Sequence, residues 1–279
     1  MNQLCIFDMD ETLLSTDKSI TEQNIAAIQK LRELDIGVSI ATGRGPCLTG
    51  KYADILSLNL PIIACNGGLL VTPDHHDIIW ENPIDKELLR IVLRYVISEN
   101  AEYIAHTNEA VYVSPGNTHV DHFAEYNKSV PGHRKAVIRP TSGIRLDEPL
   151  PDIIKVLIFE PTQEQTDYLK GIPGLEVLSS MTNVLDIMQE GSTKGNAVVS
   201  LAKYLNIPLD NIVVFGDNEN DISMFTCGAV GVAMGNSSDT VKSYAKFVTR
   251  TNEESGVAYA INNYVLPYFG YVSGCEDRS

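Results

Sequence analysis

The feature of this 279-residue sequence that most restricts its fold is a set of short apolar runs that end abruptly in polar residues. Leu4–Phe7 runs into Asp8-Met9-Asp10, Val38–Ala41 into Thr42-Gly43-Arg44, and Ile212–Phe215 into Gly216-Asp217. Short runs that are apolar throughout, or nearly so as in Val38–Ala41 with its Ser39, are typical of strands buried on both faces, as in parallel sheets. Parallel strands point the same way, so we expect the polar clusters to converge at the edge where open α/β sheets bind ligands.

Helix patterns separate these runs. Thr21 is placed as the N-cap of a helix whose apolar face continues to Leu34, and Gly37 is expected to end it. Pro46 fits the first turn of a second helix. Ile62–Ala64 is expected as a third strand, and a hairpin follows at 69–71 and 78–80. The last third of the chain is predicted to hold helices at 194–205, 221–226 and 257–264 and a strand at 230–234.

The middle of the chain has a different order of expected helices, strands and loops. Asp85 caps an expected amphipathic helix, and Pro-containing polar loops follow. Expected strands lie at 101–106, 110–114, 153–159, 175–178 and 184–188, with a helix near 163–169. We therefore predict an α/β fold, a doubly wound parallel sheet (Rossmann-like) core with an inserted α+β cap domain. The predicted division is 1–81 for the first part of the core, 82–189 for the cap and 190–279 for the second part of the core.

Composition excludes some classes of partner. Apolar residues are 44% of the chain, and 21 Lys and Arg face 36 Asp and Glu, giving a net charge of −15. This charge repels phosphate backbones and anionic lipid, so we expect no nucleic acid, no membrane and no evident obligate protein partner. Five cysteines without a paired spacing favour a reducing compartment. With no signal peptide recognisable in the first residues, the expected location is cytoplasmic.

The polar clusters suggest phosphate and metal chemistry. Asp8 and Asp10 stand two apart after a strand, so their carboxylates share one side of extended backbone. Mg²⁺ would relieve their repulsion, and Asp217 would add a further oxygen ligand. Taken alone, Asp8 and Asp10 are explained more simply as residues that cap a turn or a helix.

Three further segments fit the same chemistry. Thr42 and Gly43 offer a hydroxyl and an accessible backbone amide, although Thr-Gly is also ordinary turn chemistry. Lys194 precedes a helix and offers a positive charge for phosphate, although a surface lysine is the simpler interpretation. The run 216–221 is rich in acidic and amide side chains, and a solvated loop is the alternative to a metal site.

Taken together, these residues resemble the four motifs of the haloacid dehalogenase superfamily. The motifs are Asp8-Met9-Asp10-Glu11-Thr12, Thr42-Gly43, Lys194, and Gly216-Asp217 followed by Asn220-Asp221. An insertion of about a hundred residues between the second and third motifs, with the Asn66-Gly67 turn, resembles the Cof-type branch of sugar-phosphate phosphatases. Glu11 stands where many members have glycine. A carboxylate there would hinder phosphate binding unless it points away, and we expect a modest effect at most.

The resemblance implies roles for single residues. Asp8 would attack phosphorus and bind Mg²⁺, and Asp10 would act as acid and base while its carbonyl contacts the metal. Thr42 and Lys194 would bind the phosphoryl group, with backbone amides from Met9 and Gly43. The resemblance further implies Asp217 as metal ligand, with Asn220 and Asp221 as supporting residues. Arg44, directly after the Thr42-Gly43 turn, and Asn66 are candidate substrate contacts, with a structural ion pair as the alternative role for Arg44.

The leading hypothesis is a Mg²⁺-dependent phosphatase that hydrolyses small phosphorylated metabolites through an aspartyl-phosphate intermediate. Sugar phosphates are the first candidate substrates. Alternatives are a phosphatase of a cofactor or flavin-pathway phosphate and a phosphosugar mutase. A different class is a phosphate-accepting regulatory switch. His119 and His122 have metal-ligand spacing on a helix, but no third ligand lies near them in sequence, so packing or surface exposure is expected.

Overall fold

The computed structural model describes residues 1–181 and 183–271, the side chains at positions 180 and 181 excepted. Its contacts divide the chain into two compact units. The first comprises residues 1–42, 56–62 and 194–279, and the second residues 43–55 and 63–193. These units do not coincide with the predicted division, since residues 43–55, 63–81 and 190–193 fall in the second unit rather than in the first.

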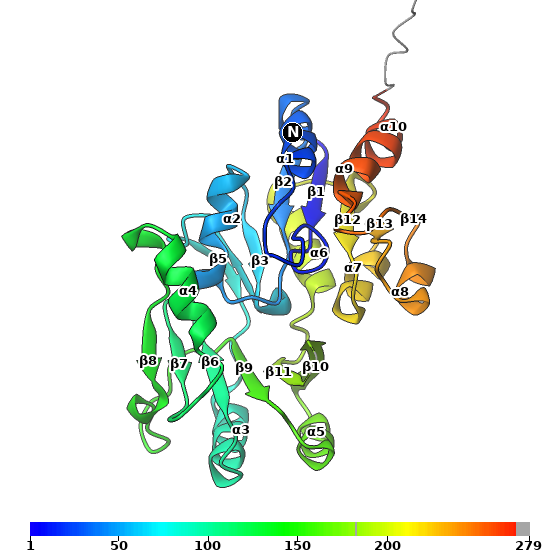
Figure 1. Cartoon of the computed structure of the whole chain (residues 1–279). Coiled ribbons are helices and arrows are strands. Elements are labelled where there is room, and N and C mark those ends of the chain that lie inside the picture. The colour runs from blue at the N-terminus through cyan, green and yellow to red at the C-terminus, as the bar shows by residue number, and fades with distance from the viewer. Residues whose placement is uncertain (182, 272–279) are drawn as a thin grey trace, which may run out of the picture. The chain divides into compact units, whose positions relative to one another are not determined.

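The first unit is built on a parallel sheet of five strands in the order β14-β13-β12-β1-β2. Their bounds are β1 Leu4–Phe7, β2 Gly37–Ile40, β12 Ile212–Gly216, β13 Val230–Ala233 and β14 Phe247–Val248. In Figure 1, β1 lies between β2 and β12. Every residue of β1, β2, β12 and β13 is buried, as expected for strands covered on both faces. The predicted parallel α/β core is confirmed.

Helices follow the strands of this unit. They are α1 Glu22–Glu33, α6 Lys194–Leu205, α7 Ile222–Thr226, α8 Asp239–Tyr244, α9 Gly256–Ala260 and α10 Leu266–Tyr268, with a π-helical turn at Ile261–Val265. Thr21 caps α1 as predicted and accepts the amide of Asn24. Gly37 does not end α1: Asp35 takes the left-handed conformation (φ 58°), and Gly37 already belongs to β2. The predicted helix 257–264 is interrupted by the π-turn, and α8 and β14 were not predicted.

The larger sheet of the second unit has six strands in the order β10-β11-β9-β6-β7-β8. Their bounds are β6 Tyr103–His106, β7 Val111–Val113, β8 Ile138–Pro140, β9 Lys155–Phe159, β10 Leu175–Met181 and β11 Val184–Gln189. All pairs are antiparallel except β7 with β8. The helices are α3 Lys86–Ser98, α4 Asp121–Ser129 and α5 Gln163–Lys170. Asp85 caps α3 as predicted, whereas α4 and β8 lie where only loops were expected.

A smaller sheet completes this unit. Strands β3 Ile62–Ala64, β4 Leu69–Val71 and β5 Ile78–Glu81 pair in this order, and β4 and β5 form the predicted antiparallel hairpin. The prediction that Ile62–Ala64 belongs to the parallel core sheet was wrong, because β3 pairs with β4 instead. The helix expected at Pro46 is a 3₁₀ turn, Pro46–Leu48, followed by α2 Gly50–Ile55.

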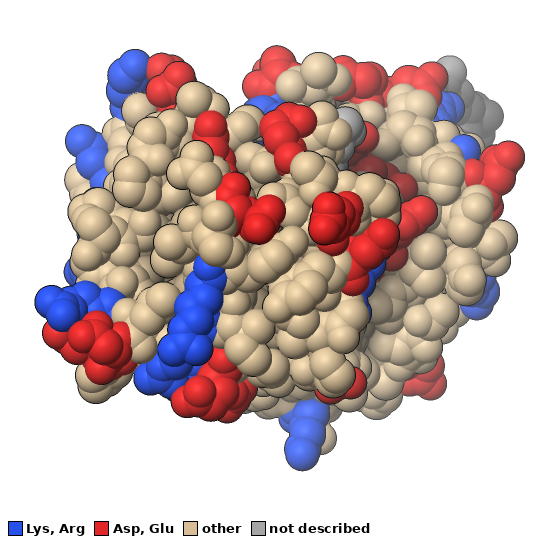
Figure 2. Space-filling model, turned by 90° about the horizontal axis from the view of Figure 1, so that it is seen from below, with Lys and Arg blue, Asp and Glu red and all other residues tan. Residues whose placement is uncertain are grey.

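Charged side chains are dispersed over the surface. On the face in Figure 2, Asp and Glu side chains lie at many places among uncharged residues, and Lys and Arg stand mostly in small groups beside them. Within residues 1–181 and 183–271, helices are too short or too polar to cross a membrane. Cys5, Cys47, Cys65 and Cys227 are free thiols, and Cys275 lies outside the described residues.

Candidate active site

Three carboxylates meet at the carboxyl ends of β1 and β12. Asp8 follows β1 directly, and Asp217 and Asp221 follow β12. One oxygen from each of the three lies within 4.8 Å of the others, and all three residues are buried. Because β1 and β12 are parallel neighbours paired from Leu4–Ile212 to Phe7–Phe215, their last residues end side by side. The sequence prediction that these two clusters converge is confirmed.

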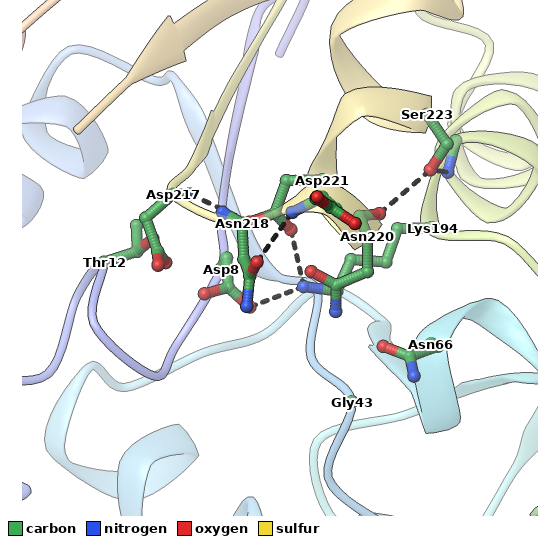
Figure 3. A network of polar contacts seen from close by, with 12 residues as sticks. Asp8, Thr12, Gly43, Asn66, Lys194, Asp217, Asn218, Asn220, Asp221 and Ser223 are labelled. Atoms are coloured by element: carbon green, nitrogen blue, oxygen red, sulfur yellow. Dashed lines mark hydrogen bonds and ion pairs between the residues drawn. The ribbon is translucent and has the colours of Figure 1, made fainter. Parts of the chain in front are cut away.

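Lys194 lies between two of these carboxylates. Its Nζ donates to Asp8 Oδ1 and to Asp221 Oδ1, each at 2.6 Å, and its side chain is 1% exposed. Figure 3 shows the Lys194 side chain reaching from the start of α6 to both oxygens. Burial lowers the pKa of Lys194, but the Asp221 and Asp8 carboxylates outweigh it and hold the ammonium charged.

Burial and the charge of Lys194 have opposite effects on the pKa values of these carboxyl groups. Burial raises the pKa of Asp8 well above its usual range, and Lys194 opposes that effect. Burial, and then the charge of Asp221, raise the pKa of Asp217 to about 7. Carboxyl groups with raised pKa values gain from any cation that joins them, so this cluster favours metal binding.

Backbone geometry after β12 fixes the third carboxylate. Asp221 Oδ2 accepts the amides of Asp217 (2.9 Å) and Asn218 (3.0 Å), which folds the side chain back over the strand end. A Cβ at Gly216 would lie 2.5 Å from the Asp221 side chain, so this turn needs glycine. Because both Asp221 oxygens are already engaged, Asp221 positions the loop and Lys194.

Two hydroxyl groups support the cluster, and sequence reasoning assigned no role to either. Thr12 Oγ1 donates to Asp217 Oδ1 at 2.6 Å and is fully buried. Ser223 Oγ accepts the amide of Gly195 and donates to the carbonyl of Asn220, both at 3.1 Å (Figure 3). Thr12 closes the first motif, so its hydroxyl was a usable signal, whereas nothing local marks Ser223.

Other predicted residues of the first unit lie at the same strand ends. Thr42 is buried just beyond β2, and Met9 is buried next to Asp8. The carboxylate of Asp10 lies outside the cluster of three acids: it pairs with Lys18 Nζ at 2.9 Å and is 40% exposed. Glu11 is exposed and adopts φ 60°, the left-handed conformation that glycine adopts most readily.

Three predicted residues belong to the second unit and lie close together there. A Cβ on Gly43 would come within 2.9 Å of Asn66 Oδ1, so the loop leaves no room for a side chain at 43. Asn66 adopts φ 52° and donates to Asp186 Oδ2 at 2.6 Å. The guanidinium of Arg44 lies 5.2 Å from the centre of the Tyr52 ring.

Sequence reasoning missed the partners of this loop. Lys155 Nζ donates to the Gly43 carbonyl at 2.6 Å and pairs with Asp186 Oδ2 at 3.2 Å. Each stands as the one charged residue inside an apolar run, Ile153–Phe159 and Val184–Met188. A single charge inside an apolar strand is a signal that could have marked each of these two residues, although not their pairing.

The two histidines with metal-ligand spacing, His119 and His122, make aromatic contacts. His119 stacks on Phe159 with ring centres 4.1 Å apart, and His122 packs on Phe123 at 4.0 Å. Both therefore make packing contacts within the second unit.

A parallel sheet with a buried lysine between aspartates at its carboxyl edge is an arrangement suited to binding a phosphoryl group. The sequence pattern of the haloacid dehalogenase-like hydrolases matches residues 5–261, and the chain belongs to this family. It is a phosphatase of the haloacid dehalogenase type, in the Cof-type branch, as the sequence motifs predicted.

Relatives match over nearly the whole chain. Phosphatase YwpJ of Bacillus subtilis is 29% identical, covering 94% of this chain and 99% of the relative. The 5-amino-6-(5-phospho-D-ribitylamino)uracil phosphatase YitU of Bacillus subtilis is also 29% identical, with 94% and 97% covered. A haloacid dehalogenase-like hydrolase structure from B. subtilis superimposes with a TM-score of 0.80 at 27% identity, covering 94% of this chain and 99% of that one.

Proposed function

We propose that this protein is a Mg²⁺-dependent phosphatase that hydrolyses phosphomonoesters of small metabolites, with sugar phosphates as the first candidates. The observation that carries this proposal is the position of Lys194, buried between Asp8 and Asp221. A buried ammonium at the edge of a parallel sheet offers a fixed positive charge to an incoming phosphoryl group.

The acidic cluster fits the metal. Its donors are carboxylate oxygens, which Mg²⁺ prefers. Burial, and after it the charge of neighbouring carboxylates, raises the pKa values of Asp8 and Asp217, and a bound cation would stabilise their charged forms. We assign Asp8, Asp217 and the main-chain carbonyl of Asp10 as the protein ligands. Bound there, Mg²⁺ would neutralise negative charge on the reacting phosphoryl group.

In the first half-reaction, a carboxylate oxygen of Asp8 attacks phosphorus. The new bond to Asp8 forms as the bond to the leaving oxygen breaks, and Asp10 gives that oxygen its proton. Lys194, the Thr42 hydroxyl and the backbone amides of Met9 and Gly43 bind the phosphoryl oxygens.

In the second half-reaction, Asp10 takes a proton from water as the water oxygen attacks phosphorus. The bond between phosphorus and Asp8 breaks, which releases inorganic phosphate and restores the Asp8 carboxylate. Asp221 and Asn220 keep Lys194 and the 217–221 loop in place. Opening of the Asp10–Lys18 pair would free the Asp10 carboxylate for this role.

We propose further that residues 82–189 act as the cap that selects the leaving group, with Arg44 and Asn66 as substrate contacts. The net charge of −15 favours a small metabolite over nucleic acid, and the free thiols favour a cytoplasmic location. The similarity to YitU makes a flavin-pathway phosphate the second candidate substrate.

The test is release of inorganic phosphate from a panel of phosphorylated sugars, nucleotides, cofactors and ribitylaminouracil phosphate, with Mg²⁺ or with EDTA. We expect turnover of at least one sugar phosphate, and its loss on EDTA treatment and in Asp8→Asn, which is isosteric but cannot attack phosphorus. Turnover that survives Asp8→Asn at the wild-type rate would contradict the assignment. Preferred turnover of ribitylaminouracil phosphate would select the second candidate.

A further inference from the structure

The second unit contains a buried ion pair to which the proposed reaction assigns no role. Lys155 in β9 is 3% exposed and Asp186 in β11 is fully buried, and Lys155 Nζ lies 3.2 Å from Asp186 Oδ2. Taking two charges out of water costs several kcal/mol for each ion, and an apolar pair is often at least as stable. Stability alone therefore does not explain why two apolar strands each carry one charge here.

The other partners of the pair point to its role. Lys155 Nζ donates to the Gly43 carbonyl at 2.6 Å, and Asp186 Oδ2 accepts from Asn66 Nδ2 at 2.6 Å. The two loops are joined as well, because the Cys65 amide donates to the Arg44 carbonyl at 2.9 Å. Lys155 thus binds the loop that follows Thr42, and Asp186 binds the neighbouring turn that contains Asn66.

The turn that Asp186 holds is conformationally strained. Cys65 and Asn66 adopt φ 51° and 52°, and Gly67 follows at φ 95°, so three consecutive residues have positive φ. Left-handed conformations outside glycine cost about 1 kcal/mol or more each and persist where surrounding contacts enforce them. Since Gly43 is itself a flexible residue packed against Asn66, its carbonyl needs a fixed partner to hold one orientation.

We propose that Lys155 and Asp186 are positioning residues for phosphoryl binding. Lys155 fixes the plane of the Gly43–Arg44 peptide, and Asp186 fixes the side chain of Asn66, so the Thr42-Gly43 loop is already in its binding conformation before substrate arrives. Neither residue touches the substrate. This inference rests on the proposed function for the role of Gly43, but the conformational restraint is measurable without turnover.

The decisive variant is Lys155→Met combined with Asp186→Leu, which replaces the charges by apolar side chains. Either change alone leaves one buried charge unpaired and should lower the melting temperature strongly. The double variant should recover part of that loss, because an apolar pair of similar volume packs in its place, while the Gly43 carbonyl and the Asn66 amide lose their partners. Its kcat should nevertheless stay about 10- to 100-fold below wild type, the range expected when a binding loop is misplaced.

Two readouts separate positioning from packing. The inhibition constant of inorganic phosphate, used as a probe of the phosphoryl site, should rise in the double variant. Amide hydrogen exchange at residues 43–45 and 65–68 should become faster, while exchange in β1 and β12 stays as in wild type. A double variant with wild-type kcat, phosphate affinity and exchange would overturn the proposal.

A second variant keeps the test decisive if the double variant does not fold. Lys155→Arg retains the charge opposite Asp186 but presents a planar group to the Gly43 carbonyl, so we expect reduced kcat with little change in melting temperature. Unchanged kcat and unchanged exchange in Lys155→Arg would overturn the proposal.

The matched control is Asp54→Asn, which weakens the contact of Arg134 Nη2 with Asp54 Oδ1 (2.6 Å) elsewhere in the second unit. Asp54→Asn should leave kcat and amide exchange at residues 43–45 unchanged. Wild type and Asp8→Asn are assayed in the same experiment. Equal phosphate release by these two proteins would contradict the proposed function but not this inference, because amide exchange still tests whether Lys155 and Asp186 hold the two loops.

Discussion

Replacing Lys194 by Met removes the one ammonium that faces the Asp8 and Asp221 carboxylates in the described site. Each contact spans 2.6 Å, and a charge pair at about 4 Å is worth about 4 kcal/mol at an effective dielectric constant of about 20. Desolvation of the ammonium offsets part of this attraction. The net cost of leaving buried carboxylates without their cation is expected to be about 3–5 kcal/mol of unfolding free energy.

The same substitution should impair catalysis. Lys194 is the fixed positive charge proposed to bind the phosphoryl oxygens, and loss of one such group typically lowers kcat by about 10²- to 10³-fold. Urea unfolding measures the stability, and phosphate release at saturating substrate and Mg²⁺ measures kcat. Because Met has similar length, packing along the side chain is largely retained.

Lys203→Met is the control for this experiment, since Lys203 lies on the same helix, α6, but is exposed. It should change neither stability nor kcat appreciably. A Lys194→Met protein that is less stable but keeps wild-type kcat would refute the assignment of Lys194 to phosphoryl binding. Unchanged stability would refute the electrostatic account of the cluster.

Two further predictions concern stability. Burial first, and then the charges of Lys155 and His122, lower the pKa of His106 to about 3, so between about pH 6.5 and 3 the unfolded chain binds a proton that the folded protein excludes. The free energy of unfolding should therefore fall as pH decreases through this window, by up to about 1.4 kcal/mol per pH unit from this residue. In His106→Leu, urea unfolding at a series of pH values should show a smaller dependence of this free energy on pH. An equal dependence in the two proteins would contradict the assignment to His106. Gly195→Ala should lower the free energy of unfolding by about 1–3 kcal/mol, because the new Cβ would lie 2.1 Å from the Ser223 carbonyl oxygen. The control Gly143→Ala, whose Cβ would have nothing within 4 Å, should leave this free energy unchanged. Equal stability of the two variants would be inconsistent with this packing.

The core and the acidic cluster were predictable because their signals are local. A buried strand such as β1 is a short apolar run, and Asp8 follows it at once. Thr21 and Asp85 mark helix starts through side-chain caps, which depend only on neighbouring residues. Once parallel strands are recognised, the convergence of their ends follows from topology.

The remaining features depend on contacts between residues distant in sequence. The run Ile62–Ala64 has the composition of a buried parallel strand, yet it pairs with β4, and composition carries no information on the partner. The sequence of α4 contains polar residues and follows Pro115, so it reads as loop, although Phe123 and Tyr126 anchor it to the unit's core. Lys155 and Asp186 become recognisable as a pair only when β9 and β11 are seen to be neighbours.

The central claim is that Asp8 carries the phosphoryl group during turnover. Rapid mixing of enzyme with a substrate identified in the panel, followed by acid quench and peptide mass spectrometry, tests it most directly. We predict a mass increase of one phosphoryl group on the peptide that contains Asp8, removed by hydroxylamine and absent in Asp8→Asn. Full turnover with the phosphoryl group on another residue, or on none when the quench is faster than turnover, would contradict the account.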